Sequence, residues 1–270
     1  MDLNKDKIIF DGAMGTQLQS LGLRDDPVLL NLSHPEEIIN IHKQYLEAGA
    51  DIITSNTFGA YAYKYENAAE IIKSAISHAR KALKEYPSCL LALDLGPTGL
   101  MLEPYGDTTH EETTAIFEEA IKSGIESGVD LILIETMMDP EELRLAVEAA
   151  KTTSLPIIAT MSFNENGRTM MGTSVQDMVF LLEGLEVTAI GMNCGFGPDI
   201  YAKLLPSLKS NLPIILQPNA GLPIVEDGTV RYNQSPEDYA KIVTQTNVKI
   251  MGGCCGTTPA HIAALARMVK

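Results

Sequence analysis

One stretch decides the fold of this sequence: Asn247-Val-Lys-Ile-Met-Gly-Gly-Cys-Cys-Gly-Thr-Thr-Pro-Ala-His261. Its apolar run at 248–251 predicts a short buried strand, and Thr258-Pro259 predicts the N-cap and first residue of a helix. Cys254 and Cys255 therefore follow the carboxyl end of a strand and precede the N-terminus of a helix. The partial positive charge of that helix end favours thiolate over thiol.

The same pattern of apolar run and helix recurs along the chain. The predicted strands are residues 8–10, 51–54, 89–93, 131–134, 156–161, 188–192, 213–216 and 248–251. Unbroken apolar runs are typical of parallel strands that are covered on both faces. Eight predicted strands in 270 residues favour an α/β fold, in which residues 1–270 form a single (β/α)8 TIM barrel rather than an open doubly wound sheet. A small hairpin at 226–232 is expected to decorate the seventh loop.

Capping signals mark where several helices should begin. Ser33-His-Pro-Glu-Glu37 combines a cap residue with an early proline, and Asp139-Pro-Glu-Glu142 has the form of a capping box. Ser235 should cap the helix before the last strand in the same way.

Polar and glycine-rich segments follow the predicted strands, at the end where barrels of this kind carry their sites. They contain Asp11, Asn56, Asp94, Glu135, Cys194, Asn219 and the pair Cys254-Cys255. Because the carboxyl ends of parallel strands meet at one end of a barrel, we expect these residues to converge, with the site at that end.

Three cysteines at matching strand ends predict a site for a soft metal, most plausibly zinc. Cys194 follows one apolar run, and Cys254 and Cys255 follow another. The alternatives are ordinary buried cysteines or a strained vicinal disulfide. Cys89 begins a strand and is expected at the opposite end of the barrel or in its core. The histidines offer no clear ligand, and His261 fits a capping role better.

Three thiolates leave a fourth zinc position open, as in catalytic sites. A zinc ion bound by three thiolates is electron-rich and therefore activates water poorly. It can still deprotonate a thiol, whose free pKa is about 8.5. We therefore expect transfer of an alkyl group to a substrate thiol.

Further residues could hold the two charged ends of an amino acid. The turn Asp11-Gly-Ala-Met-Gly-Thr16 offers backbone N–H groups for a carboxylate, and Glu135 could accept an ammonium. Ser55, Asn56 and Asn219 are weaker candidates, and bracing of loops is the alternative for both asparagines.

Composition excludes several classes of partner. Lys plus Arg is 20 and Asp plus Glu is 35, so the formal net charge is −15. Nucleic acids and anionic membranes both require basic patches, so neither is expected. No signal-peptide or membrane-spanning pattern is visible, which favours a cytoplasmic protein with reduced cysteines.

Seven motifs together carry a family resemblance. They are Asp11-Gly-Ala-Met-Gly-Thr16, Ser55-Asn-Thr-Phe-Gly59, Asp94-Leu-Gly-Pro-Thr-Gly99, Ile134-Glu-Thr136, Met192-Asn-Cys-Gly195, Pro218-Asn-Ala-Gly221 and Gly252-Gly-Cys-Cys-Gly-Thr-Thr-Pro259. The sequence resembles the homocysteine S-methyltransferase family, and within it the homocysteine-binding module of cobalamin-dependent methionine synthases.

The resemblance implies a (β/α)8 barrel that makes methionine from L-homocysteine. It implies Cys194, Cys254 and Cys255 as ligands of one zinc ion, with the homocysteine sulfur as the fourth ligand. By the same resemblance, the amino acid is held by Asp11, Gly12, Gly15, Thr16 and Glu135.

The methyl donor is left open by the sequence. Methylcobalamin on a separate corrinoid protein or a missing domain is favoured by the likeness of the motifs. S-methylmethionine is an alternative, and betaine is less favoured because the chain has no Trp for an aromatic cage. A hypothesis of another class is a zinc-dependent subunit that only binds homocysteine.

Overall fold

A computed structural model describes residues 5–226 and 229–270 of the chain. The strands are β1 (Ile8–Ile9), β2 (Ile52–Thr54), β3 (Leu90–Leu95), β4 (Leu131–Met137), β5 (Ile157–Met161), β6 (Ala189–Cys194), β7 (Ile214–Pro218), β8 (Pro223–Glu226), β9 (Thr229–Tyr232) and β10 (Ile250–Met251). The helices are α1 (Gly15–Ser20), α2 (Leu30–Ser33), α3 (Pro35–Glu47), α4 (Ala68–Leu83), α5 (His110–Ser127), α6 (Pro140–Lys151), α7 (Val175–Gly184), α8 (Pro198–Leu204), α9 (Pro236–Gln245) and α10 (Pro259–Val269), with a 3-10 turn η1 (Leu205–Ser207).

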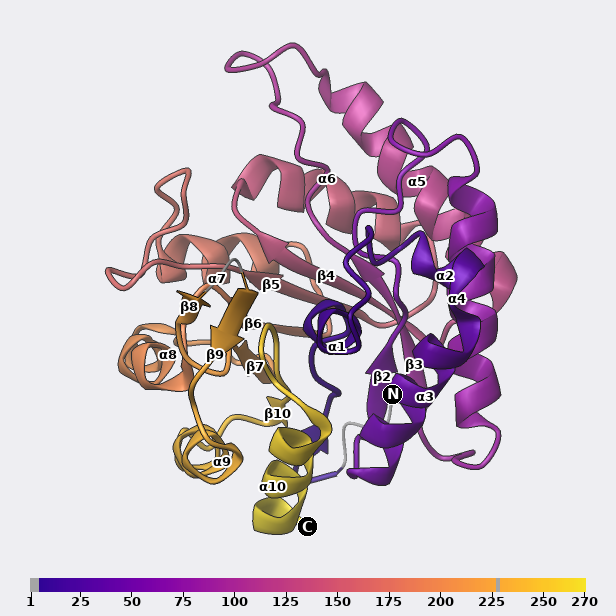
Figure 1. Ribbon diagram of the computed structural model, residues 1–270. Helices are drawn as coiled ribbons and strands as arrows, with labels where there is room; N and C mark the ends of the chain where they lie inside the picture. The colour runs from indigo at the N-terminus through magenta and orange to yellow at the C-terminus, as the bar shows by residue number, and fades with distance from the viewer. Residues whose placement is uncertain (1–4, 227–228) are drawn as a thin grey trace.

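Eight parallel strands form one sheet in the order β1-β10-β7-β6-β5-β4-β3-β2. A bridge between Phe10 and Ile52 joins the two outer strands. The Asp51 N–H donates to Ile9 O at 2.7 Å and the Asp11 N–H donates to Ile52 O at 3.0 Å across the same seam. The expected (β/α)8 barrel is therefore confirmed, with its helices packed around the sheet (Figure 1).

Alternate residues of each strand supply two apolar layers. Leu131 and Leu133 of β4 belong to the small cluster inside the barrel. Ile132 and Ile134 belong to the larger cluster between the sheet and the helices. Because side chains of a strand alternate between its two faces, a strand buried on both needs an unbroken apolar run.

Several strands continue beyond their apolar runs. β4 ends at Met137 rather than at residue 134, and β6 ends at Cys194 rather than at residue 192. Cys194 is still paired with Pro218 of β7. Strand pairing uses backbone groups, so polar residues extend a strand as well as apolar ones do. Glu135 and Cys194 thus lie on the rigid ends of strands.

At two of the predicted helix starts the helix begins at the expected proline, but the capping interactions differ from those predicted. Ser33 belongs to α2, and α3 has His34 as its N-cap with no side-chain hydrogen bond. Asp139 does cap α6, accepting from the Glu141 and Glu142 N–H groups. The Glu142 carboxylate closes no capping box, because it accepts from the N–H and hydroxyl of Thr98 instead.

Other capping predictions agree with the structure. Ser235 accepts from the Asp238 N–H at the start of α9. Thr258 and His261 cap α10 reciprocally, which gives this histidine a structural partner.

The hairpin after β7 consists of β8 and β9, which are antiparallel. Residues 227 and 228, inside the predicted hairpin, lie outside the described residues. No helix among those described is both long and apolar enough to cross a bilayer.

Asp51 joins both ends of the chain at the amino ends of the strands. Its carboxylate accepts from the Ile9 N–H at 2.9 Å, from Lys5 Nζ at 3.0 Å and from Lys270 Nζ at 2.8 Å. Burial alone would raise the pKa of Asp51, but the hydrogen bonds from Lys270, Ile9 and Lys5 outweigh it and lower this pKa. The ionised carboxylate therefore stabilises the seam between β1 and β2.

Asp51→Asn is expected to lower the free energy of unfolding by about 1 kcal/mol at pH 7, a modest value because both lysines are about half exposed. The folded-state pKa lies below the unfolded value of about 3.9, so the stabilisation is present above about pH 5 and is lost as the pH falls through the folded-state pKa. Urea unfolding at pH 7 and pH 3.5 should show the difference shrinking at the lower pH. The exposed Asp107→Asn is the control, and an equal loss at both pH values would contradict a role for the charge.

Candidate functional site

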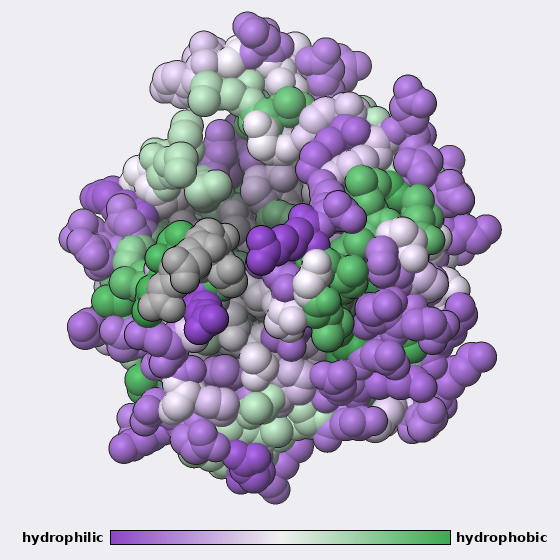
Figure 2. Space-filling model, viewed as in Figure 1, coloured by the Kyte–Doolittle hydropathy of each residue, from purple (hydrophilic) through white to green (hydrophobic). Residues whose placement is uncertain are grey.

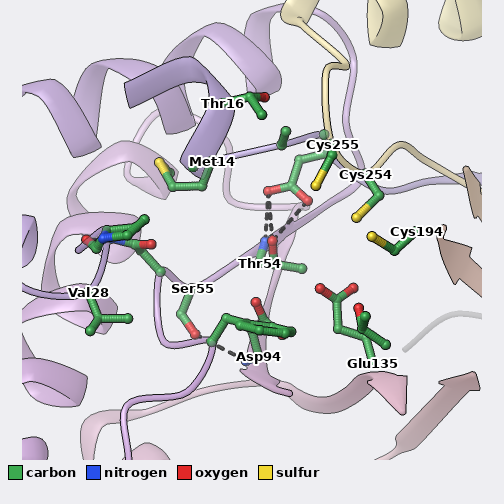
Figure 3. Close-up of a pocket in the computed structure, with 18 of the residues that line it drawn as sticks. Met14, Thr16, Val28, Thr54, Ser55, Asp94, Glu135, Cys194, Cys254 and Cys255 are labelled. Carbon is green, nitrogen blue, oxygen red and sulfur yellow. Dashed lines mark hydrogen bonds between the residues drawn. The ribbon is translucent and has the colours of Figure 1, made fainter. Parts of the chain in front are cut away.

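The three predicted cysteines meet at the carboxyl end of the barrel. One sulfur from each of Cys194, Cys254 and Cys255 lies within 4.8 Å of the other two. In Figure 3 the three side chains point toward one another. Among the described residues no other His, Cys, Asp or Glu group has the spacing of a metal site.

Backbone geometry brings these sulfurs together. Cys194 ends β6 with a φ of 57°, which turns the chain sharply out of the sheet. The Cys254 N–H donates to Pro218 O at 2.9 Å, and the Ala220 N–H donates to Cys255 O at 2.9 Å. The loops after β7 and β10 therefore support each other next to the end of β6.

The first and last loops of the barrel also lie side by side, as the indigo and yellow segments in Figure 1 show. The Gly253 N–H donates to Asp11 O at 3.0 Å, and the Ala13 N–H donates to Thr257 Oγ1 at 3.1 Å. A Cβ on Gly12 would lie 2.6 Å from Thr257 Oγ1. Glycine is thus required where the two loops meet.

The three cysteine sulfurs are suited to bind a cation. Hydrogen bonds with Cys194 and Cys254 lower the pKa of the Cys255 thiol to about 3. Hydrogen bonding with Cys194 and Cys255, together with burial, raises the pKa of Cys254 far above its ordinary value. The protein alone thus accommodates one negative charge among three sulfurs, and a soft metal ion is what would allow all three to ionise.

Cys89 lies at the other end of the barrel, as expected. It precedes the first residue of β3, and its thiol donates to Ala50 O at 3.4 Å. Cys89 lies at the amino end of β3, and the carboxyl end of this strand faces the site. The Cys89 sulfur therefore cannot reach the other three sulfurs.

A cavity of about 460 Å³ opens beside the sulfurs. Its walls include the Gly12–Thr16 turn, Thr54 to Asn56, and Glu135. Figure 2 shows this face of the molecule hollowed near its centre. Lys64 is the one basic residue among the lining residues, and it lies 3.6 Å from Asp26, with which it forms an ion pair. The other carboxylate-bearing side chains in the lining, those of Asp11, Asp94 and Glu135, have no basic residue of the lining paired with them.

Two buried acids, Asp11 and Asp94, and the half-buried Glu135 line the cavity. Burial raises the pKa of Asp11 to about 7, although hydrogen bonds from the Thr54 N–H and hydroxyl oppose the rise. Burial and the negative charges of Asp11 and Cys255 raise the pKa of Glu135 to about 8. Burial, Glu135 and Asp11 raise the pKa of Asp94 well above its ordinary value. An ammonium group placed among them would be strongly favoured.

Asp94 was expected at this end of the barrel without a specific role, and Asn193 was not predicted as a site residue. Asp94 Oδ1 is buried with no hydrogen-bond partner. Asn193 is fully buried, and its Nδ2 donates to Glu135 Oε2 at 3.3 Å and to Thr136 Oγ1 at 2.7 Å. Asn193 thereby orients the Glu135 carboxylate. Its position directly before Cys194 was the available signal.

All but one of the remaining predicted residues line the cavity, and the exception is Asn219. Gly12, Gly15, Thr16, Ser55 and Asn56 line it. Thr16 Oγ1 also accepts from the Gly256 N–H at 3.2 Å. The Asn56 side chain donates to Pro27 O at 2.6 Å and to Asn31 Oδ1 at 3.3 Å, so it braces two loops. Asn219 is buried, and its Oδ1 has no hydrogen-bond partner.

Comparison with known proteins agrees with this geometry. The family model described as homocysteine S-methyltransferase matches residues 8–269. A methionine synthase from Mycobacterium tuberculosis is 29% identical over 297 residues, which cover 99% of this chain and 25% of that protein. A methionine synthase from Mycobacterium leprae is 28% identical. The chain thus spans about a quarter of the length of these curated relatives.

Two solved proteins have folds similar to that of this chain. The metallated form of the homocysteine methyltransferase MmuM from Escherichia coli is 25% identical, with a TM-score of 0.81 over 98% of this chain and 96% of that one. Pyruvate carboxylase from Rhizobium etli, 14% identical with a TM-score of 0.56, shares the fold alone. Since the family model covers nearly the whole chain, this protein belongs to the homocysteine S-methyltransferase family.

Proposed function

We propose that this chain is a zinc-dependent enzyme that transfers a methyl group to the sulfur of L-homocysteine and forms methionine. The observation that carries the proposal is the meeting of three cysteine sulfurs within 4.8 Å, beside a cavity lined by buried acids. Family membership supports the reaction class. The existence of a metallated form of the similar Escherichia coli homocysteine methyltransferase supports a bound metal.

Cys194, Cys254 and Cys255 would hold zinc through their thiolates. When bound, zinc supplies a fourth position at which the substrate thiol loses its proton while its sulfur remains nucleophilic. The rigid ends of β6 and the paired loops after β7 and β10 keep the three sulfurs in place.

The cavity would orient homocysteine by its charged ends. Glu135, Asp11 and Asp94 would surround the ammonium group. The backbone of Gly12, Gly15 and Thr16 would face the carboxylate. Asn193 would keep the Glu135 carboxylate turned toward the ligand through the hydrogen bond described above. Burial of these groups excludes water, which strengthens each contact.

Two methyl donors have support from different observations. Methylcobalamin on a corrinoid protein or further domain is favoured because the chain matches about a quarter of two methionine synthases. A small sulfonium such as S-methylmethionine is the second candidate, because the chain also matches 96% of the length of a homocysteine methyltransferase.

The residues that line the cavity disfavour betaine as the methyl donor. Tyr61, Tyr63 and Tyr65 do not line the cavity, and their hydroxyls bond to Gly96 O, Thr98 O and the Asp26 carboxylate. Phe58 is the one aromatic residue among the lining residues. A cage around a quaternary ammonium needs several aromatic faces.

A donor assay tests these proposals. The zinc-loaded chain would be incubated with homocysteine and, separately, methylcobalamin, S-methylmethionine or betaine, and methionine would be measured by chromatography. We expect methionine with methylcobalamin and none with betaine, and no turnover in Cys254→Ala. Turnover with S-methylmethionine alone would assign the second donor. Tight binding of homocysteine without turnover of any donor would contradict the enzyme and favour a homocysteine-binding subunit.

A further inference from the structure

Four tyrosines in the described part of the chain are almost completely buried, each at most 1% exposed. They are Tyr45 of α3, Tyr201 of α8, Tyr239 of α9 and Tyr61 in the loop after β2. A buried phenol needs a hydrogen-bond partner, because its hydroxyl has lost its contacts with water. Each of the four hydroxyls donates to a backbone carbonyl, and three of these carbonyls lie close in the chain to the metal-binding cysteines.

Tyr239 joins the two loops that meet at Cys254. Its hydroxyl lies 2.7 Å from Gly252 O, two residues before Cys254, and 3.1 Å from Pro218 O at the end of β7. The Cys254 N–H donates to the same Pro218 O at 2.9 Å. One phenol thus fixes both the residue that leads into the cysteine pair and the strand end against which the pair rests.

Tyr201 holds the backbone beside the third cysteine. Its hydroxyl donates to Asn193 O at 3.0 Å, directly before Cys194. The chain turns out of the sheet here, since Cys194 has a φ of 57° and Gly195 a φ of 64°. A Cβ on Gly195 would lie 3.1 Å from the Tyr201 hydroxyl oxygen. Glycine at this position therefore leaves room for the phenol.

Tyr45 links the end of the metal loop to the turn proposed for the substrate carboxylate. Its hydroxyl lies 2.7 Å from Ala13 O and 3.2 Å from Thr257 O. Ala13 belongs to the Gly12–Thr16 turn, and Thr257 follows Cys255 by two residues. The substrate turn and the cysteine pair are thus held to one buried side chain.

We propose that Tyr45, Tyr201 and Tyr239 are positioning residues whose hydroxyls hold the three cysteine sulfurs at the spacing that a zinc ion needs before the ion binds. The proposal rests on the proposed zinc site. Each tyrosine projects from a different helix outside the sheet (Figure 1), so each loop is tied to the rigid body of the barrel. Ligands that are already in place lose little conformational freedom when the metal binds. Groups that orient metal ligands commonly change metal affinity by about 10–100-fold.

Tyr239→Phe tests the hydrogen bonds, because it removes one oxygen and keeps the ring. Zinc transfer from the protein to a coloured chelator would be timed. Absorption of the Co²⁺-substituted protein would be recorded, since the visible bands of cobalt report its coordination geometry without any turnover. We expect zinc to be lost about tenfold or more faster than from the unmodified protein, with the cobalt bands weakened and shifted. Tyr45→Phe and Tyr201→Phe repeat the test at the other two cysteines and should act in the same direction.

Tyr61→Phe is the matched control. Tyr61 is as buried as the other three and donates to Gly96 O, but this carbonyl lies in the loop after β3, which carries no cysteine. The variant loses the same kind of buried hydrogen bond, so its melting temperature should fall much as that of Tyr239→Phe does. Its zinc-loss rate and cobalt bands should remain those of the unmodified protein.

The comparison of these variants decides between positioning and folding. Zinc loss no faster than in Tyr61→Phe, or equally accelerated in Tyr61→Phe, would show that the hydroxyls serve the fold alone and would leave the three-cysteine site intact. If Tyr239→Phe does not fold, Tyr201→Phe decides by the same criterion, and failure of both to fold would also count against a positioning role. Failure of the unmodified protein to bind either metal would overturn the proposed function and this inference together.

Discussion

Cys254→Ala is expected to reduce zinc from about one ion per chain to nearly none and to slow methionine formation at least about a thousandfold. Cys254 supplies one of the two sulfurs that the loop after β10 brings to the cluster, and its N–H donates to Pro218 O. Two remaining thiolates cannot complete a site that leaves one position for substrate. Metal analysis after dialysis and a methionine assay would measure both losses.

The matched control is Cys89→Ala. Cys89 is a partly buried cysteine like the other three, but its thiol donates to Ala50 O at the opposite end of the barrel. We expect it to keep its zinc and its activity. Full zinc occupancy in Cys254→Ala, or loss of zinc in Cys89→Ala, would show that the ligands have been misassigned.

Glu135→Gln is expected to raise the KM for homocysteine by about tenfold to a hundredfold, with a smaller change in kcat. Hydrogen bonds to charged groups contribute about 1.5–3 kcal/mol, which corresponds to this range. The variant keeps the size of the side chain and removes the charge that an ammonium group would meet. Steady-state kinetics with the donor identified by the assay would separate KM from kcat.

Glu142→Gln is the control for the loss of a buried acid. Glu142 is 5% exposed and accepts from Thr98, but it does not line the cavity. We expect its KM to stay unchanged even if its melting temperature falls. An equal rise of KM in both variants would mean that Glu135 acts through folding rather than through the substrate.

Much of the fold was visible in local patterns. The run Leu131–Ile134 places leucines inside the barrel and isoleucines under the helices, so one unbroken apolar segment predicted a strand that is buried on both faces. The convergence of the cysteines followed in the same way, because carboxyl ends of parallel strands meet at one end of a barrel. These features depend on neighbours within a few residues.

Other features depend on partners far away in the chain. Ser33 had the chemistry of a cap, but it became the last residue of α2. Glu142 had the position for a capping box, but its carboxylate accepts a hydrogen bond from the Thr98 N–H instead. In both cases tertiary packing offered a competing arrangement that no local preference describes.

The sequence by itself determined the eight-fold alternation, the end of the barrel that carries the site and the set of three cysteines, because periodicity and strand polarity are local properties. Only the tertiary structure decided which groups surround those cysteines. Asn193 of β6 reaches Glu135 of β4, and Thr257 reaches Ala13 between the last and first loops. Such contacts are selected by how these elements pack against one another, and residues 58 or 244 positions apart carry no mark of it in their spacing.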